Sequence, residues 1–148
     1  MPAWELAQLN IAVMAHPLDS PEMADFVAGL DRINALAEAA PGFVWRFQSD
    51  DGNATAFRPF GEQTLVNMSV WRDVESLADY VYRSAHADIM RRRREWFGRM
   101  QEAHTVLWWV PQGHRPGMDE AGERLADLRK SGPGPGAFTF RQRYPAPP

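Results

Sequence analysis

The sequence contains no cysteine. This absence excludes disulfides, thiolate metal sites and cysteine nucleophiles, and it predicts a protein of the reducing cytoplasm. No apolar run approaches the length of about 18 residues that a spanning helix needs, so we expect no membrane association. Residues 1–10 also lack the basic and then apolar pattern of a secretory signal. Because the net charge is −3 and no chain-wide basic patch is apparent, we expect no nucleic-acid partner.

The motifs of common cofactor and catalytic sites are missing as well. His16, His104 and His114 are scattered, and no H-x-H, H-E-x-x-H or carboxylate cluster joins them, so no metal site is expected. No G-x-G-x-x-G or G-x-x-x-x-G-K-[ST] run is present, which argues against dinucleotide and P-loop sites. No serine stands in a G-x-S-x-G elbow, so the hydrolase nucleophile of that motif is not expected either.

What the chain has in quantity is aromatic surface, with six tryptophans and eight phenylalanines among 148 residues. So much aromatic area has to be buried in a core, a pocket or a subunit interface. The length is typical of one domain with a real hydrophobic core. We therefore expect a single domain over residues 1–148, with a proline-rich tail at 142–148.

Hydrophobic patterning predicts alternating strands and helices. Strands are expected at 4–13, 43–48, 65–72 and 104–111, and a short edge strand at 137–141. Helices are expected from the N-cap Ser20 to Pro41, within 73–100, and at about 119–130. The region 73–100 carries two apolar stripes that are opposite in phase, so a straight helix would expose one of them. We therefore predict a break between Arg83 and Asp88, with Ser84 as the cap of the second helix.

The order β-α-β-β-α-β, extended by a helix and a short strand, is that of the ferredoxin-like α+β fold. Such an antiparallel sheet carries its helices on one face and leaves the other face in need of cover. Here the second face carries large apolar residues. A sheet from a second subunit would cover it, so a two-fold homodimer is predicted.

Several stretches also resemble a known family. They are LAQLNIA (6–12), LDSP (18–21), GFVWR (42–46), LVNMSVW (65–71), YRSAH (82–86) with the arginine run after it, and AFTF (137–140). Together they are similar to the domain-of-unknown-function 3291 family over nearly the whole chain. That family looks like a branch of the dimeric α/β-barrel superfamily, which includes antibiotic-biosynthesis and haem-degrading monooxygenases. The resemblance implies a dimeric α/β barrel and suggests monooxygenase-like chemistry.

His86 is the strongest candidate for that chemistry. On the phase of the second stripe it shares a face with Ile89, Arg93, Trp96 and Met100, so it is expected to point inward. An inward, neutral imidazole can act as a general base or as a ligand. The alternative is a histidine that only caps the helix break and hydrogen-bonds to backbone groups.

The resemblance also suggests partners for His86. Haem-degrading members place an asparagine on the first strand, a tryptophan on the helix after the third strand, and an iron-binding histidine further on. Asn10, Tyr80 and His86 stand at similar places, with a tyrosine in place of the tryptophan. We expect no cofactor: if the protein is an enzyme, His86 takes a proton from an electron-rich aromatic substrate that Asn10 and Tyr80 orient, and oxygen is added without metal or flavin. Haem bound by His86 is the second hypothesis, and a non-catalytic binding or structural homodimer is the third.

A pocket for a small apolar ligand would need walls and a few polar groups. Asn10, Asn67 and Ser69 lie in mid-strand positions, and they would form one polar patch if the first and third strands are neighbours. The alternative is plain cross-strand hydrogen bonding within a dimer interface. The expected substrate-binding residues are Trp45, Asn67, Ser69, Trp71, Arg93 and Trp108. Tryptophans at such positions also occur as plain core.

Arg93 needs a separate explanation because it interrupts the apolar stripe of the second helix. A buried guanidinium must pair with a carboxylate, extend past Trp96 to solvent, or meet an anionic ligand. We expect it to pair within the dimer. The arginines beside it, Arg91, Arg92 and Arg94, are interpreted as a solvated face.

Overall fold

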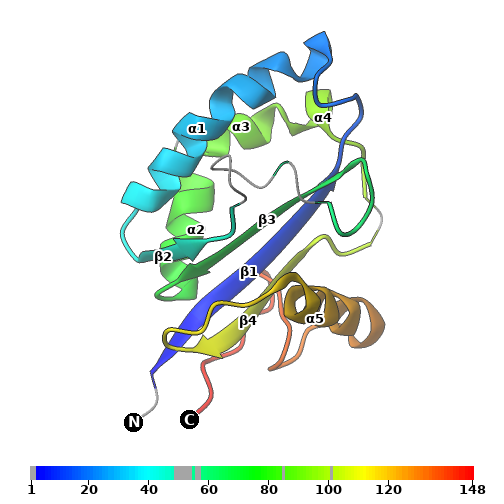
Figure 1. The fold of residues 1–148 in the computed structure, drawn as a ribbon. Helices are drawn as coiled ribbons and strands as arrows, with labels where there is room; N and C mark the ends of the chain where they lie inside the picture. Colours follow the sequence, from blue (N-terminus) through cyan, green and yellow to red (C-terminus); the bar gives the residue numbers. More distant parts are fainter. Residues whose placement is uncertain (1–2, 49–54, 56–57, 85, 101) are drawn as a thin grey trace.

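The computed structural model describes residues 3–48, 55, 58–84, 86–100 and 102–148, with the side chains of His86 and Ile89 outside that description. It shows a four-stranded antiparallel sheet in the order β2-β3-β1-β4 (Figure 1). The strands are β1 (Trp4–Val13), β2 (Phe43–Arg46), β3 (Thr64–Trp71) and β4 (Thr105–Pro111). The helices are η1 (Pro21–Met23), α1 (Ala24–Ala39), α2 (Val74–Arg83), α3 (His86–Arg91), α4 (Arg93–Trp96) and α5 (Met118–Ser131). The predicted α+β, ferredoxin-like fold is confirmed.

Helices lie on both faces of the sheet, with α1 to α4 on one face and α5 on the other (Figure 1). Successive side chains of a strand point to opposite faces, so β1 serves both layers. Gln8 and Asn10 belong to the side of α1, called here the α1 face, and Leu9 and Ile11 belong to the α5 face. The antiparallel register continues this division onto β3, where Ser69 lies opposite Gln8.

The α5 face is apolar and closed within a single chain. Its sheet residues are Ala7, Leu9, Ile11, Val66, Met68, Val70, Val106, Trp108 and Val110, all buried. Helix α5 packs against them with Ala121, Leu125 and Leu128. The ring of Phe60 also reaches α5, where its Cε1 lies 3.5 Å from the place that a Cβ on Gly122 would take.

This cover removes the reason for which a dimer is predicted from the sequence. The prediction depended on an open apolar face, and among the described residues that face is already filled by α5 from the same chain. Burying a large apolar side chain contributes about 1.5–3 kcal/mol, so the chain gains from α5 what a second sheet would have supplied. The homodimer itself stays a prediction.

The long helical region after β3 is broken where the sequence predicts a break. Helix α2 ends at Arg83, and Ser84 has an extended backbone with φ −100° and ψ −177°. Its hydroxyl donates to the carbonyl of Tyr80, which satisfies an end of α2. A further break at Arg92, which the hydrophobic pattern does not predict, separates α3 from α4.

Two expectations about chain ends and caps change. The hydroxyl of Ser20 donates to the carbonyl of Pro17 and makes no capping hydrogen bond to η1. The expected strand at 137–141 is reduced to two isolated bridges, Leu107 with Phe138 and Gly134 with Ala137. The predicted tail is anchored to the sheet, because the indole N–H of Trp109 donates to the carbonyl of Tyr144 at 2.9 Å.

No helix in the described ranges is long and apolar enough to cross a membrane.

Candidate functional site

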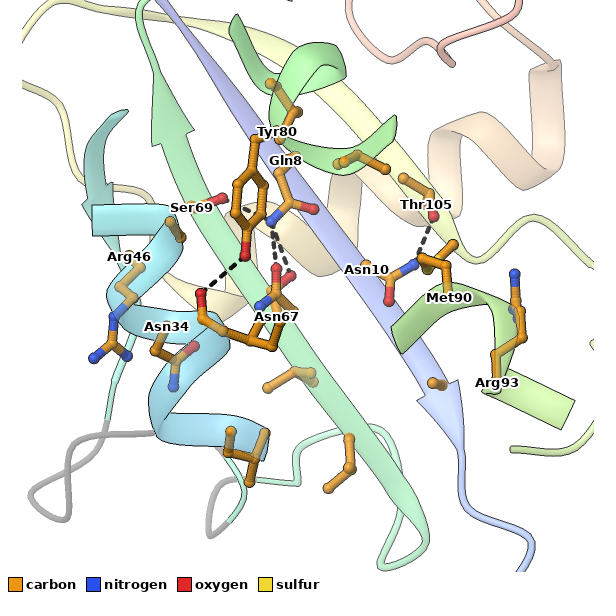
Figure 2. A pocket seen from close by; sticks show the side chains of 18 of the residues that line it. Gln8, Asn10, Asn34, Arg46, Asn67, Ser69, Tyr80, Met90, Arg93 and Thr105 are labelled. Atoms are coloured by element: carbon orange, nitrogen blue, oxygen red, sulfur yellow. Dashed lines mark hydrogen bonds between the residues drawn. The ribbon is translucent and has the colours of Figure 1, made fainter. Parts of the chain in front are cut away.

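A cavity of about 350 Å³ lies between the α1 face of the sheet and the helices over it. Its size falls within the range of small-molecule sites, roughly 300–1,000 Å³. The helices supply apolar walls from Phe26, Leu30, Ile33, Leu77, Val81 and Met90. The sheet supplies a polar floor from Gln8, Asn10, Asn67, Ser69 and Thr105 (Figure 2). A molecule in this space would meet hydrocarbon on one side and hydrogen-bonding groups on the other.

Gln8 on β1 is the centre of a hydrogen-bond network on this floor. Its Nε2 donates to Asn67 Oδ1 at 2.7 Å and to Ser69 Oγ at 2.8 Å. Ser69 Oγ also accepts the indole N–H of Trp71 at 2.8 Å. Gln8 and Ser69 are buried, so these bonds satisfy groups that would be costly to leave unpaired. Because its oxygen accepts both bonds, Ser69 keeps its own hydrogen to donate.

Asn10 extends the floor toward β4. Its Nδ2 donates to Thr105 Oγ1 at 2.7 Å, and Thr105 is the residue opposite Asn10 in the strand register. Among the described residues, Asn10 Oδ1 and Asn67 Nδ2 have no hydrogen-bond partner. The floor therefore offers a bound molecule one amide oxygen as acceptor, and one amide nitrogen and the Ser69 hydroxyl as donors.

Tyr80 on α2 covers Trp71 from above. The two rings stack with centroids 5.2 Å apart and planes at 29°. The Tyr80 hydroxyl donates to the carbonyl of Ile33 at 3.0 Å, which ties α2 to α1 (Figure 2). Burial raises the pKa of Tyr80 to about 12, against an opposing effect of the Arg46 charge. The phenol is therefore neutral at physiological pH, so Tyr80 can position a bound molecule but cannot act as a base.

The chain matches a protein-family model over almost its whole length. The family model named Domain of unknown function (DUF3291) matches residues 5–148. The chain belongs to the DUF3291 family. No curated protein matches it.

Several solved structures resemble this DUF3291 protein at low identity. NE2512, a protein of unknown function from Nitrosomonas europaea, is 15% identical with a TM-score of 0.49, over 76% of this chain and 93% of that one. SnoaB, a cofactor-independent oxygenase from Streptomyces nogalater, is 16% identical with a TM-score of 0.47, over 78% and 98%. A dabb family protein with a ferredoxin-like fold from Mesorhizobium loti is 10% identical with a TM-score of 0.44, over 76% and 99%. Identities this low carry no information on activity.

The DUF3291 match includes every residue that lines the cavity. The structure brings together there most of the residues expected to form the site, namely Asn10, Asn67, Ser69, Trp71, Tyr80 and Arg93. They come from β1, β3, α2 and α4, so elements far apart in the sequence build one space. The prediction that the first and third strands are adjacent in the sheet is confirmed by the β1–β3 pairing.

Trp45 and Trp108 are placed elsewhere. Trp45 lies opposite Val70 in the strand register and packs against the α5-face core. Trp108 is fully buried in that same core, where its indole N–H donates to Glu120 Oε2 at 2.8 Å. Both therefore miss the cavity, and the expectation that they line it is corrected. The chain has two consecutive tryptophans on β4, and alternation sends Trp108 and Trp109 to opposite faces.

Sequence reasoning missed Gln8, Thr105 and Arg46 of this DUF3291 site. Gln8 could have been found, because it lies two residues before Asn10 on a strand and therefore shares its face. Thr105 needs the register of β4 against β1, which a sequence does not display. Arg46 at the end of β2 lines the cavity and lies 3.6 Å from the Glu38 carboxylate.

The role of His86 depends on a side chain outside the described part of the structure. His86 is the first residue of α3, and its roles as general base or iron ligand both stay predictions. His104 also lines the cavity, and its Nδ1 is buried without a hydrogen-bond partner among the described residues. Within the same ranges, no group of three or more His, Asp or Glu side chains could hold a metal ion. Haem bound by His86 stays a prediction, because a haem iron can be held by one histidine and the side chain of His86 lies outside the described part.

Proposed function

We propose that this protein binds a small, flat and largely apolar molecule in the cavity between its sheet and helices α1 to α4. The floor network carries the proposal. Gln8 fixes the side chains of Asn67 and Ser69, while Asn10 Oδ1 and Asn67 Nδ2 have no partner within the described residues. Asn10 is half-buried and Asn67 is exposed, and both line the cavity, so these two amide groups are accessible to the polar groups of a bound molecule.

Helix α1 supports the same proposal. It carries an apolar stripe, yet Ala37 is its one buried residue, while Phe26, Leu30 and Ile33 on the stripe are half-buried and line the cavity. Apolar area kept out of contact forgoes about 25 cal/mol for each Å². A flat apolar occupant would complete the packing of α1 against the sheet.

The chemistry that we propose for this site is oxygenation of an electron-rich aromatic substrate without a metal or flavin. A base removes a proton from an activated methylene group, and the resulting anion gives an electron to O₂ before the two recombine as a peroxide. Loss of water then leaves a carbonyl, so one oxygen atom of O₂ enters the product and the other leaves as water. Ser69 and Asn67 would donate hydrogen bonds to the oxygen on which the negative charge develops.

His86 is the proposed base in this scheme. It lies in the same helix as the lining residue Met90 and four positions before it, and positions four apart share one face of a helix. Anthrone, which has an activated methylene group between two aromatic rings, is a suitable test substrate for oxygen uptake. We expect H86A to lose turnover and the limb of the pH–rate profile that reports the base. An unchanged pH profile in H86A would remove His86 from the mechanism.

Binding can be tested independently of turnover, with 2-naphthol as the probe and isothermal titration calorimetry as the measurement. Gly29 on α1 lines the cavity, and the adjacent Ala28 is exposed. Gly29→Leu should fill part of the space and raise the dissociation constant by at least about tenfold, which corresponds to 1.4 kcal/mol. Ala28→Leu is the matched control and should bind like the parent protein. Equal binding by both variants would contradict the proposal and favour a structural role for this layer.

A further inference from the structure

The cavity has an unbalanced set of charges. Its lining includes Arg46 and Arg93 but, among the described residues, no aspartate and no glutamate. The chain as a whole has a net charge of −3, with 19 acidic and 16 basic residues. A wall with two cations and no carboxylate therefore departs from the balance of the rest of the molecule.

The two arginines differ in what surrounds them. Arg46 has the carboxylate of Glu38 at 3.6 Å, so its charge is partly offset from outside the cavity. Arg93 has no carboxylate within 4.0 Å in the part of the chain that the structure describes. It is also half-buried, so solvent replaces a partner only in part.

The neighbours of Arg93 show that carboxylates are available locally but used by other arginines. Arg91 pairs with Asp88, and Arg92 is held by both Asp25 and Glu95 at 2.9 Å. Arg92 also lies 4.8 Å above the ring of Trp96. Arg93, which lines the cavity, thus has no carboxylate partner among the described residues, while two of its exposed neighbours, Arg91 and Arg92, are paired.

We propose that the ligand is an anion, with a flat apolar body over the floor network and a carboxylate that pairs with Arg93. Arg93 and Met90 lie at the end of the cavity near Asn10 and Thr105, and Arg46 lies toward the other end with Asn34 (Figure 2). A guanidinium presents two parallel N–H donors that fit the two oxygens of a carboxylate. The inference rests on the proposed binding function and adds the charge of the ligand and its direction in the cavity.

A pair of probes that differ only in charge tests this inference. Naphthalene-2-carboxylate and its neutral isostere naphthalene-2-carboxamide have nearly the same shape, and their affinities can be measured by calorimetry at low salt. We expect the parent protein to prefer the carboxylate by about 10- to 100-fold, the range for a charge-assisted hydrogen-bonded pair. Arg93→Met should abolish that preference while the affinity for the amide stays the same, and Arg93→Lys should keep part of it.

Arg94→Met is the matched control, because Arg94 is exposed on the same short helix and does not line the cavity. It should retain the full preference, and thermal unfolding of each variant checks that all are folded. If Arg93→Met keeps the preference, or if Arg46→Met removes it instead, the assignment to Arg93 is wrong. The parent protein could bind the amide and the carboxylate equally well, with Gly29→Leu weakening the binding of the amide. That result would contradict this inference and leave the proposed binding function standing. Failure of both probes to respond to Gly29→Leu would sink the proposed function itself.

Discussion

The two faces of one sheet differ in almost every physical respect. On the α5 face, apolar side chains such as Leu9 and Met68 are buried against a helix of the same chain. On the α1 face, one position away along the same strands, Gln8 and Ser69 form a polar floor under a cavity. Strand alternation is what makes this possible, since each strand can stabilise the fold with one set of residues and build a site with the other.

The contrast also shows how a small protein tolerates an unfilled space. The cavity forgoes packing on one side, and the closed layer on the other side supplies the compensating apolar burial. Truncations of apolar residues on the α5 face should therefore change stability with little effect on binding. On the α1 face, residues with a polar group open to the cavity, such as Asn10, should change binding more than stability. The following experiments break or sharpen that difference.

The largest effect is expected for Leu9→Ala. Leu9 has no exposed area, and truncation of a buried leucine to alanine costs about 2–5 kcal/mol through lost burial and a residual cavity. Urea unfolding measures the loss, and calorimetry at a temperature where the variant is folded should give an unchanged affinity for 2-naphthol. Asn10→Ala on the other face is the comparison, and it should lower the affinity for 2-naphthol more than it lowers the free energy of unfolding. A large change of affinity in Leu9→Ala would show that the faces are not independent.

Ser69→Ala should have the next largest effect on stability. The change removes the oxygen that accepts bonds from Gln8 and Trp71, and an unsatisfied buried donor costs about 1–3 kcal/mol. Trp71→Phe removes the stranded indole N–H, so the double variant should lose less than the sum of the single losses in urea unfolding. Strict additivity would mean that the Ser69–Trp71 bond contributes nothing to the floor.

Tyr80→Phe should cost less, about 1 kcal/mol, because it removes one hydrogen bond to the carbonyl of Ile33 and keeps the ring on Trp71. Because burial raises the pKa of Tyr80 to about 12, the parent and the variant should show the same pH dependence of binding between pH 6 and about 9. A difference in that window, measured by calorimetry, would show that the hydroxyl ionises near neutrality.

The smallest expected effect is a dependence of protein stability on acid pH, caused by Glu120 beside the α5 face. Burial tends to raise the pKa of the Glu120 carboxyl, but hydrogen bonds from His114 and Trp108 outweigh burial and hold it below its usual value. A carboxyl with a lowered pKa in the folded state stabilises above its unfolded value, near 4.5, and that contribution is lost as the pH falls through the folded value.

Glu120→Gln should therefore differ from the parent protein in unfolding free energy at pH 6, and the difference should shrink toward pH 3. Urea unfolding over this range is the measurement. Asp73→Asn is a useful counterpart, because hydrogen bonds from Ser76 lower the pKa of Asp73 despite its burial, on the helix side of the sheet. A Glu120 effect that grew on acidification would contradict the assigned direction.

Local patterns were enough to predict most of the fold. The alternation in β1, the proline and glycine after α1, and the phase shift near Ser84 each depend on near neighbours in the chain. They therefore identified the strands, the broken helix and the ferredoxin-like order. The β1–β3 pairing then placed Asn10, Asn67 and Ser69 together, as the sequence predicts.

Features that depend on long-range packing were not predictable in the same way. That α5 covers the second face follows from how a distant segment returns to the sheet, and alternation cannot indicate it. The face of Trp108 depends on the register of β4, so the sequence alone placed it in the site wrongly. Gln8 was overlooked for a different reason: its face was predictable from Asn10, but its hydrogen bonds to Asn67 and Ser69 appear only in the structure.

The stacked indole of Trp71 has one more consequence. It is part of the cavity wall, whereas Trp108 is sealed in the layer beneath α5. A bound molecule should therefore change the fluorescence emission of Trp71 and leave the emission of Trp108 unchanged. A Trp71→Phe protein would give the background spectrum, so the molecule carries a built-in optical gauge for screening compounds without a label.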